Sequence, residues 1–105
     1  MSFLDARIVI TGVGLTSPLG DDLPTFRENL LAGRSGVTTF PVRNLGEVPA
    51  GVCDFETTRH QSRKQLRVGT RAGSIGIYCA HEAFADAGIE PTELESSRTG
   101  VYVGI

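Results

Sequence analysis

The sequence has few of the features that mark membrane, secreted or nucleic-acid-binding proteins. No stretch approaches the roughly 20 apolar residues of a membrane span, and no long apolar core follows Met1, so we expect neither a membrane helix nor a signal peptide. Its 105 residues include 10 basic and 12 acidic side chains, and this net charge of -2 does not indicate a nucleic-acid binder. The two cysteines have no paired spacing, which argues against a disulfide framework and fits a reducing cytoplasm.

Histidine is equally scarce, because His60 and His81 are the only two. Together with Cys53 and Cys79 they do not match the ligand spacing of a zinc site. Cys79 and His81 are two residues apart, so a helix would point them to nearly opposite sides, and we predict no metal site. Cys79 is expected inside a helix, where a buried, inert thiol is usual, and Cys53 is expected in a loop beside Asp54, whose negative charge disfavours a thiolate. Neither is therefore predicted to be a nucleophile.

What the sequence does contain is a short β-branched apolar run, residues 8–10, that leads into Gly12 and Gly14. A run without polar alternation is typical of a strand that is buried on both faces, as in a parallel sheet. The glycines remove side chains where the strand would end, which backbone freedom or the close approach of another segment could require. The third glycine of a dinucleotide-binding turn is missing, so we favour close packing over a nucleotide site.

A helix is predicted over residues 22–32. Asp22 is a good N-cap, Pro24 fits the first turn, the apolar residues share one face and Gly33 follows the end. Residues 34–49 have no sustained period, which predicts a connection with room for a short edge strand at 46–48. Residues 52–58 are predicted to be irregular as well.

A longer helix is predicted to begin between His60 and Arg71 and to end at Ala87. It carries a row of small residues with helical spacing: Gly69, Gly73, Gly76, Ala80, Ala83 and Ala87. Each glycine inside a helix costs up to about 1 kcal/mol relative to alanine. We therefore expect another segment to pack closely against this row.

A second apolar run at residues 101–105 follows the long helix and is interpreted as a second buried strand. The order of strand, helix, insertion, long helix and strand predicts an α/β fold with a right-handed parallel crossover. This second strand is cut off without a capping element. We therefore expect the chain to be a fragment of a larger protein rather than a free-standing scaffold domain.

The stretch Val-Ile-Thr-Gly-Val-Gly-Leu-Thr-Ser-Pro-Leu-Gly, residues 9–20, resembles the N-terminus of the β-ketoacyl-acyl carrier protein synthases. The resemblance continues in the same order through residues 25–37, 82–89 and 98–104, and it is weakest over 38–76. It implies the thiolase fold, a layered αβαβα architecture. Residues 1–105 would form the first portion of the N-terminal domain and would be incomplete as a domain.

The resemblance also implies a function for the parent protein, namely decarboxylative Claisen condensation of an acyl thioester with malonyl-carrier in fatty acid or polyketide synthesis. Such a synthase needs no metal or organic cofactor, and it is a cytoplasmic homodimer or a heterodimer with another ketosynthase subunit. Its partners are the acyl carrier protein and the malonyl and acyl thioesters. Its catalytic cysteine and histidines would lie beyond Ile105, so residues 1–105 contain no catalytic candidate and are expected to be inactive alone. A non-catalytic subunit of the chain-length-factor type shares the same N-terminal pattern and stays open as an alternative.

A basic cluster, Arg63, Lys64 and Arg67, lies in a segment without acidic residues. A solvated helix start would explain such a cluster, and cations near a helix N-terminus gain nothing from the macrodipole. Its position is nevertheless similar to that of the basic patch with which ketosynthases receive the acidic carrier protein, so these three residues are candidate docking residues. These synthases usually have Met-Asp and an aromatic residue after the basic run. This chain has Val-Gly-Thr at 68–70, so its helix start is expected to differ.

Overall fold

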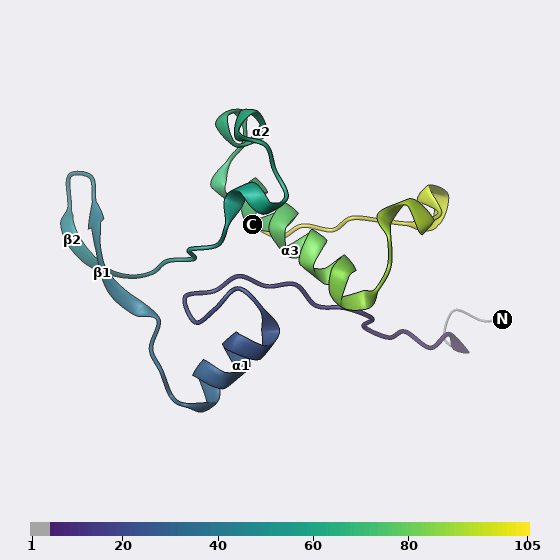
Figure 1. The fold of residues 1–105 in the computed structure, drawn as a ribbon, viewed down its shortest axis with the longest axis horizontal. Helices are drawn as coiled ribbons and strands as arrows, with labels where there is room; N and C mark the ends of the chain where they lie inside the picture. The colour runs from purple at the N-terminus through teal and green to yellow at the C-terminus, as the bar shows by residue number, and fades with distance from the viewer. Residues whose placement is uncertain (1–4) are drawn as a thin grey trace.

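The computed structural model describes residues 5–105, so residues 1–4 of the predicted N-terminal portion lie outside it. It is an α/β structure in which one long helix, α3, lies between the remaining elements (Figure 1). In chain order the elements are α1 (Leu23–Leu31), β1 (Val37–Val42), β2 (Gly46–Gly51), the 3-10 turn η2 (Thr57–Arg59), α2 (Arg63–Val68), α3 (Arg71–Ala87), and the 3-10 turns η3 (Pro91–Glu93) and η4 (Ser96–Arg98).

The first predicted helix is confirmed as α1, together with both of its end signals. The Asp22 carboxylate accepts a hydrogen bond from the Thr25 backbone N–H at 2.8 Å, which lowers the pKa of Asp22. Pro24 occupies the first turn, where no intrahelical acceptor is available for an N–H. Gly33 follows the helix with φ of 71°, the left-handed conformation that glycine adopts without strain.

The single long helix predicted from the basic segment to Ala87 is wrong, because the chain breaks it into α2 and α3. Gly69 has extended backbone angles, φ -93° and ψ 179°, so it belongs to neither helix. Thr70 then starts α3 as an N-cap whose hydroxyl accepts from the Gly73 N–H at 3.0 Å. The break between the two helices thus falls at residues 68–70, where the sequence departs from the pattern that it otherwise resembles.

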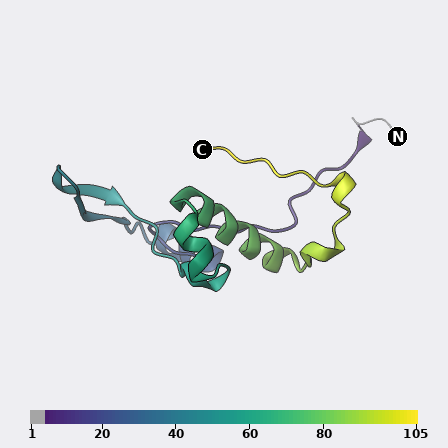
Figure 2. The same cartoon turned by 90° about the horizontal axis from the view of Figure 1, so that it is seen from above.

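The connection predicted over residues 34–49 is also wrong, because these residues form most of a β-hairpin. β1 and β2 pair antiparallel from Val37↔Gly51 to Val42↔Gly46. In the turn, the Leu45 N–H donates to the Val42 carbonyl at 3.1 Å, and Asn44 and Gly46 both have positive φ. The predicted edge strand at 46–48 is thus the first half of β2. The hairpin projects away from the three helices (Figures 1 and 2).

The predicted strands at residues 8–10 and 101–105 do not form ladders within residues 5–105. Residues 101–105 lie along α3, and within residues 5–105 no strand is hydrogen-bonded to either segment. Their apolar side chains are open to solvent, with Ile8 82% and Val101 86% exposed. An extended backbone becomes a strand only when its N–H and C=O groups form hydrogen bonds with a neighbouring strand. The parallel crossover is therefore absent from the described residues.

Close packing at the two N-terminal glycines is confirmed. A Cβ on Gly14 would meet the Cys79 carbonyl and lie 2.7 Å from the Ala83 nitrogen. A Cβ on Gly12 would lie 2.8 Å from the nitrogen and the Cβ of Ala87. The small-residue row of α3 is thus in contact at its C-terminal half with the segment that precedes α1.

The buried core of the described residues is small. Among residues 5–105 the buried apolar side chains are Phe55 and Tyr78, with Ser74 buried beside them. The radius of gyration is 17.2 Å, whereas a compact domain of this length has about 13 Å. Figure 2 shows the hairpin and the two terminal segments standing out from the helices. Most apolar faces of these elements therefore have no partner in the described part of the chain.

We predict that Gly14→Ala destabilises the intact protein by about 1–3 kcal/mol, because the added methyl group meets the α3 backbone, which cannot move aside. Gly76→Ala is the comparison variant on α3, since a Cβ there meets nothing within 4 Å among residues 5–105 and alanine favours the helix. Urea denaturation of both variants checks this. Equal stability of Gly14→Ala and the wild type would contradict the packing.

Candidate functional site

The predicted docking residues lie together on α2. Arg63, Lys64 and Arg67 are all exposed, and none forms an ion pair within residues 5–105. The helix has only six residues, and a capping box starts it: the Ser62 hydroxyl accepts from the Gln65 N–H at 3.2 Å, and the Gln65 side chain accepts from the Ser62 N–H at 2.8 Å. The structure thus presents three unpaired cations on one short, capped helix, which we call the basic helix.

The two arginines that flank the basic helix have different surroundings. The Arg71 guanidinium lies 4.8 Å from the centre of the Phe55 ring, and it donates a hydrogen bond to the Cys53 carbonyl. Arg59 forms ion pairs with Glu56 and Glu82. Both guanidinium groups are therefore engaged by the body of the chain, unlike the cations of the basic helix.

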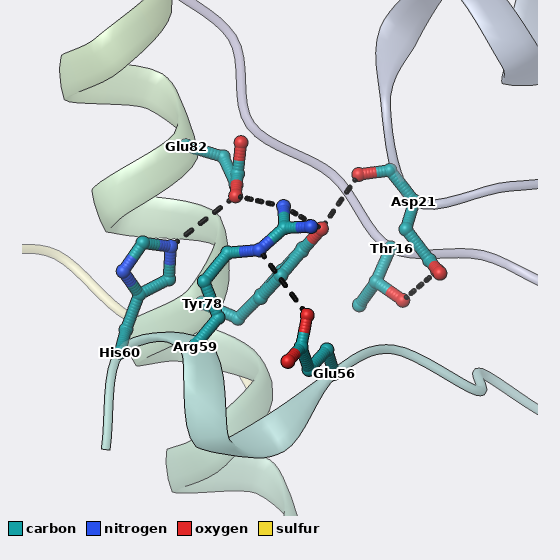
Figure 3. A network of polar contacts seen from close by, with 7 residues as sticks. All are labelled: Thr16, Asp21, Glu56, Arg59, His60, Tyr78 and Glu82. Carbon is teal, nitrogen blue, oxygen red and sulfur yellow. Dashed lines mark hydrogen bonds and ion pairs between the residues drawn. The ribbon is translucent and has the colours of Figure 1, made fainter.

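Arg59 belongs to a polar network that joins η2 to α3 (Figure 3). Its Nη1 donates to Glu82 Oε1 at 2.9 Å, and His60 Nε2 lies 3.2 Å from the same oxygen. The second contact is an ion pair only when the His60 ring is protonated. The hydrogen bond from Arg59 is the main reason that the pKa of Glu82 is lowered, and it also raises the pKa of Arg59.

Tyr78 extends this network to the loop before α1. Its hydroxyl donates to the Asp21 backbone carbonyl at 3.0 Å, and the Asp21 carboxylate accepts from the Thr16 hydroxyl at 2.8 Å (Figure 3). The ring is only 3% exposed and packs 4.8 Å from the ring centre of Phe55. Burial raises the pKa of Tyr78, which keeps its hydroxyl a donor at neutral pH. Tyr78 therefore ties the loop to α3.

The cysteines and histidines do not assemble a reactive centre in the described residues. Burial raises the pKa of the Cys79 thiol, which disfavours the nucleophilic thiolate. The His60 and His81 rings are stacked, with centroids 4.4 Å apart, although the sequence placed them 21 residues from each other. Within residues 5–105, no group of three or more His, Cys, Asp or Glu side chains is placed to hold a metal ion.

Sequence reasoning found the basic helix but missed the network beside it. Arg59 and Glu82 are 23 positions apart, and their contact depends on how η2 lies against α3. One signal was available: Tyr78 and Glu82 are four residues apart and therefore share a face of α3.

Of the helices within residues 5–105, none has the length and hydropathy needed to cross a bilayer.

Comparison with known proteins identifies the family. The family model described as "Beta-ketoacyl synthase, N-terminal domain" matches residues 5–105. The chain belongs to the β-ketoacyl synthase family. This confirms the resemblance seen in the sequence, including the segment over 38–76 where it was weakest. No solved structure was found to match the chain.

The relatives of this β-ketoacyl synthase chain include 3-oxoacyl-[acyl-carrier-protein] synthases and a polyketide synthase subunit. It is 35% identical over 102 residues to 3-oxoacyl-[acyl-carrier-protein] synthase 2 of Vibrio harveyi, covering 93% of this chain and 25% of that protein. It is 34% identical to the enzyme of the same name from Coxiella burnetii, with the same coverage. It is 32% identical over 104 residues to the tetracenomycin polyketide synthase ketoacyl synthase alpha subunit of Streptomyces glaucescens, covering 95% of this chain and 24% of that protein. The chain thus spans about a quarter of the length of these relatives.

We predict that the stabilising effect of Glu82 depends on pH. A carboxylate with a lowered pKa stabilises the folded state above its unfolded pKa of about 4.3 and loses that effect as pH falls through its folded pKa. Glu82→Gln should therefore lower the urea midpoint of the intact protein at neutral pH. The difference from wild type should shrink toward zero below about pH 4. A difference that stays constant from pH 7 to pH 3 would show that the charge of Glu82 has no stabilising role.

Proposed function

We propose that this chain is the N-terminal portion of a longer β-ketoacyl-acyl carrier protein synthase that condenses an acyl thioester with malonyl-carrier. The observation that carries the proposal is the family match along all of residues 5–105. The names of the relatives support it, because each is a 3-oxoacyl or ketoacyl synthase. These names favour the enzyme over a non-catalytic subunit of the chain-length-factor type. We also propose that this longer protein is a cytoplasmic dimer that works with an acyl carrier protein.

The exposed apolar segments fit the layered thiolase fold that we propose for the whole protein. In that fold, residues 8–10 and 101–105 would pair as parallel strands of a sheet, and α3 would cover them. Val103 and Ile105 already lie along Gly73, Gly76 and Ala80 of α3. Side chains that are 65–109% exposed, such as Val9 and Ile105, would be buried by such a sheet. The contribution of these residues is thus to the scaffold.

The chemistry that we propose takes place outside residues 1–105. A cysteine thiolate attacks the carbonyl carbon of the acyl thioester, the acyl group moves to the cysteine sulfur, and the carrier thiol leaves. Decarboxylation of the malonyl group then gives an enolate, whose carbon attacks the acyl-cysteine carbonyl and releases the thiolate. Two histidines assist decarboxylation, and backbone N–H groups stabilise the oxyanion. The family resemblance implies that this cycle requires no metal or organic cofactor.

The basic helix is the carrier-docking surface in this proposal. Its three cations are exposed, free of ion pairs within the described residues, and held by a capping box. Such a surface attracts an acidic partner, speeds its encounter and orients it. The carrier protein must deliver an acyl group to the synthase repeatedly, so fast and reversible docking suits the reaction.

We predict that replacing Arg63, Lys64 and Arg67 together by Glu strongly weakens carrier binding at low ionic strength, because attraction becomes repulsion. The wild-type affinity should fall as salt is added, whereas that of the triple variant should not. Titration of the full-length protein with acyl carrier protein at several salt concentrations checks this. Unchanged binding would show that these residues only form a solvent-exposed side of the helix and do not dock the carrier protein.

We predict that the full-length protein releases carbon dioxide from malonyl-carrier when an acyl donor is present, and that residues 1–105 alone do not. Alkylation of one cysteine outside residues 1–105 should abolish condensation. Cys53→Ser and Cys79→Ser variants should keep their activity, since neither thiol is assigned a role. Loss of turnover in either variant with an intact fold, or the absence of any reactive downstream cysteine, would overturn the proposed function.

A further inference from the structure

The basic helix is attached to the rest of the chain through the turn that precedes it. α2 packs against η2, and η2 in turn packs against α3. Arg59 is the last residue of η2, His60 follows it, and the Ser62 N-cap of the basic helix comes two residues later. Any movement of Arg59 and His60 on α3 is therefore passed directly to the basic helix.

One carboxylate oxygen holds both of these residues against α3. Glu82 Oε1 accepts from Arg59 Nη1 at 2.9 Å and lies 3.2 Å from His60 Nε2 (Figure 3). The Glu82 side chain is only 24% exposed, so its contacts are partly shielded from water. The other polar contact of Arg59 with α3 is longer, 3.5 Å to the Tyr78 hydroxyl. Apart from Glu82, the His60 ring stacks on the His81 ring and lies tilted against the Tyr78 ring, with ring centres 5.8 Å apart.

We propose that Glu82 is a positioning residue for carrier docking, because it clamps Arg59 and His60 and thereby sets the orientation of the basic helix. This inference rests on the docking function proposed above. Without the carboxylate, the Arg59 cation and the His60 ring have no acidic partner on α3. The turn and the basic helix then sample other orientations, and the three cations no longer meet the carrier protein together.

Loss of the Glu82 charge should change the affinity for the carrier protein in the direction opposite to that expected from simple electrostatics. Removing the negative charge of Glu82 makes this face more positive and frees the Arg59 cation, so charge alone would tighten binding of an acidic carrier. Loss of the clamp weakens binding instead. The two explanations can therefore be separated by the direction of the change.

The test compares Glu82→Gln with Glu28→Gln in the full-length protein. Glu28 is an exposed residue of α1 whose side chain has no ion pair within residues 5–105, so its variant makes the same change in net charge without touching the clamp. Glu82→Gln should weaken carrier binding by about fivefold or more, the lower end of typical coupling between two sites. Glu28→Gln should leave binding unchanged or slightly tighter. Glu82→Asp keeps the charge but shortens the side chain, and it serves as the second variant if Glu82→Gln does not fold.

Two further measurements distinguish positioning from general damage. Hydrogen exchange should speed up at the amides of residues 63–68 in Glu82→Gln and stay unchanged over α1. With acyl and malonyl thioesters of N-acetylcysteamine, which have no carrier protein, kcat and KM should equal those of the wild type. The loss should appear only in KM for carrier-bound substrates.

Each other outcome has a definite meaning. If the triple reversal on the basic helix weakens binding and neither Glu82 variant does, the clamp is refuted while the docking function stands. If activity with the carrier-free thioesters falls equally, Glu82 is a general structural residue and the inference is overturned. If the triple reversal leaves binding unchanged, the docking function fails and the positioning role fails with it, even if hydrogen exchange shows that the clamp holds the helix.

Discussion

The close approach of the Gly12–Gly14 backbone to α3 is the contact that holds the segment before α1 on the long helix. The two glycines place the chain so near the Cys79, Ala83 and Ala87 backbone that no side chain fits between them. The Val13 N–H between them donates to the Asp86 carboxylate of α3 at 2.9 Å, which fixes the register of the approach. Because the chain is held there, the following loop reaches the Tyr78 hydroxyl, and α1 begins at a defined place beside α3.

Different faces of α3 accordingly make different kinds of contact. Its row of small residues lets extended backbone come close, and dispersion contacts and burial dominate there. Tyr78 and Glu82, one turn apart, instead hold irregular segments through hydrogen bonds and an ion pair. Irregular segments have unpaired backbone groups and few apolar side chains, so polar side chains of a rigid helix are suited to anchoring them. α3 is therefore the common support for the loop before α1 and for the turn before the basic helix.

Features that depend on neighbouring residues could be predicted from the sequence, whereas features that depend on distant partners could not. The caps of α1 and the close packing at Gly12 and Gly14 follow from local chemistry and from the absence of a side chain. The hairpin was missed because Pro41 and Pro49 argue against strands, although Asn44 and Gly46 supply the positive φ that its turn needs. The helix break at Gly69 was signalled by the unusual residues at 68–70 but outweighed by the regular spacing of small residues. The Arg59–Glu82 pair had no local signal at all.

The basic helix illustrates how a charged surface can be presented by a chain with a small core. Arg63, Lys64 and Arg67 repel one another and gain little from the helix dipole, and six residues form a marginal helix on their own. The capping box satisfies the first N–H groups, and Leu66 is the half-buried residue on its inner side. Neither contact determines where the helix points relative to α3. Two residues, Gly69 and Thr70, join the helix to α3 at its end, and we propose that the turn before it, held by polar contacts to Glu82, sets its orientation at the start. In the docking proposal, the charged surface therefore stays fully hydrated while a partly shielded carboxylate nearby determines its geometry.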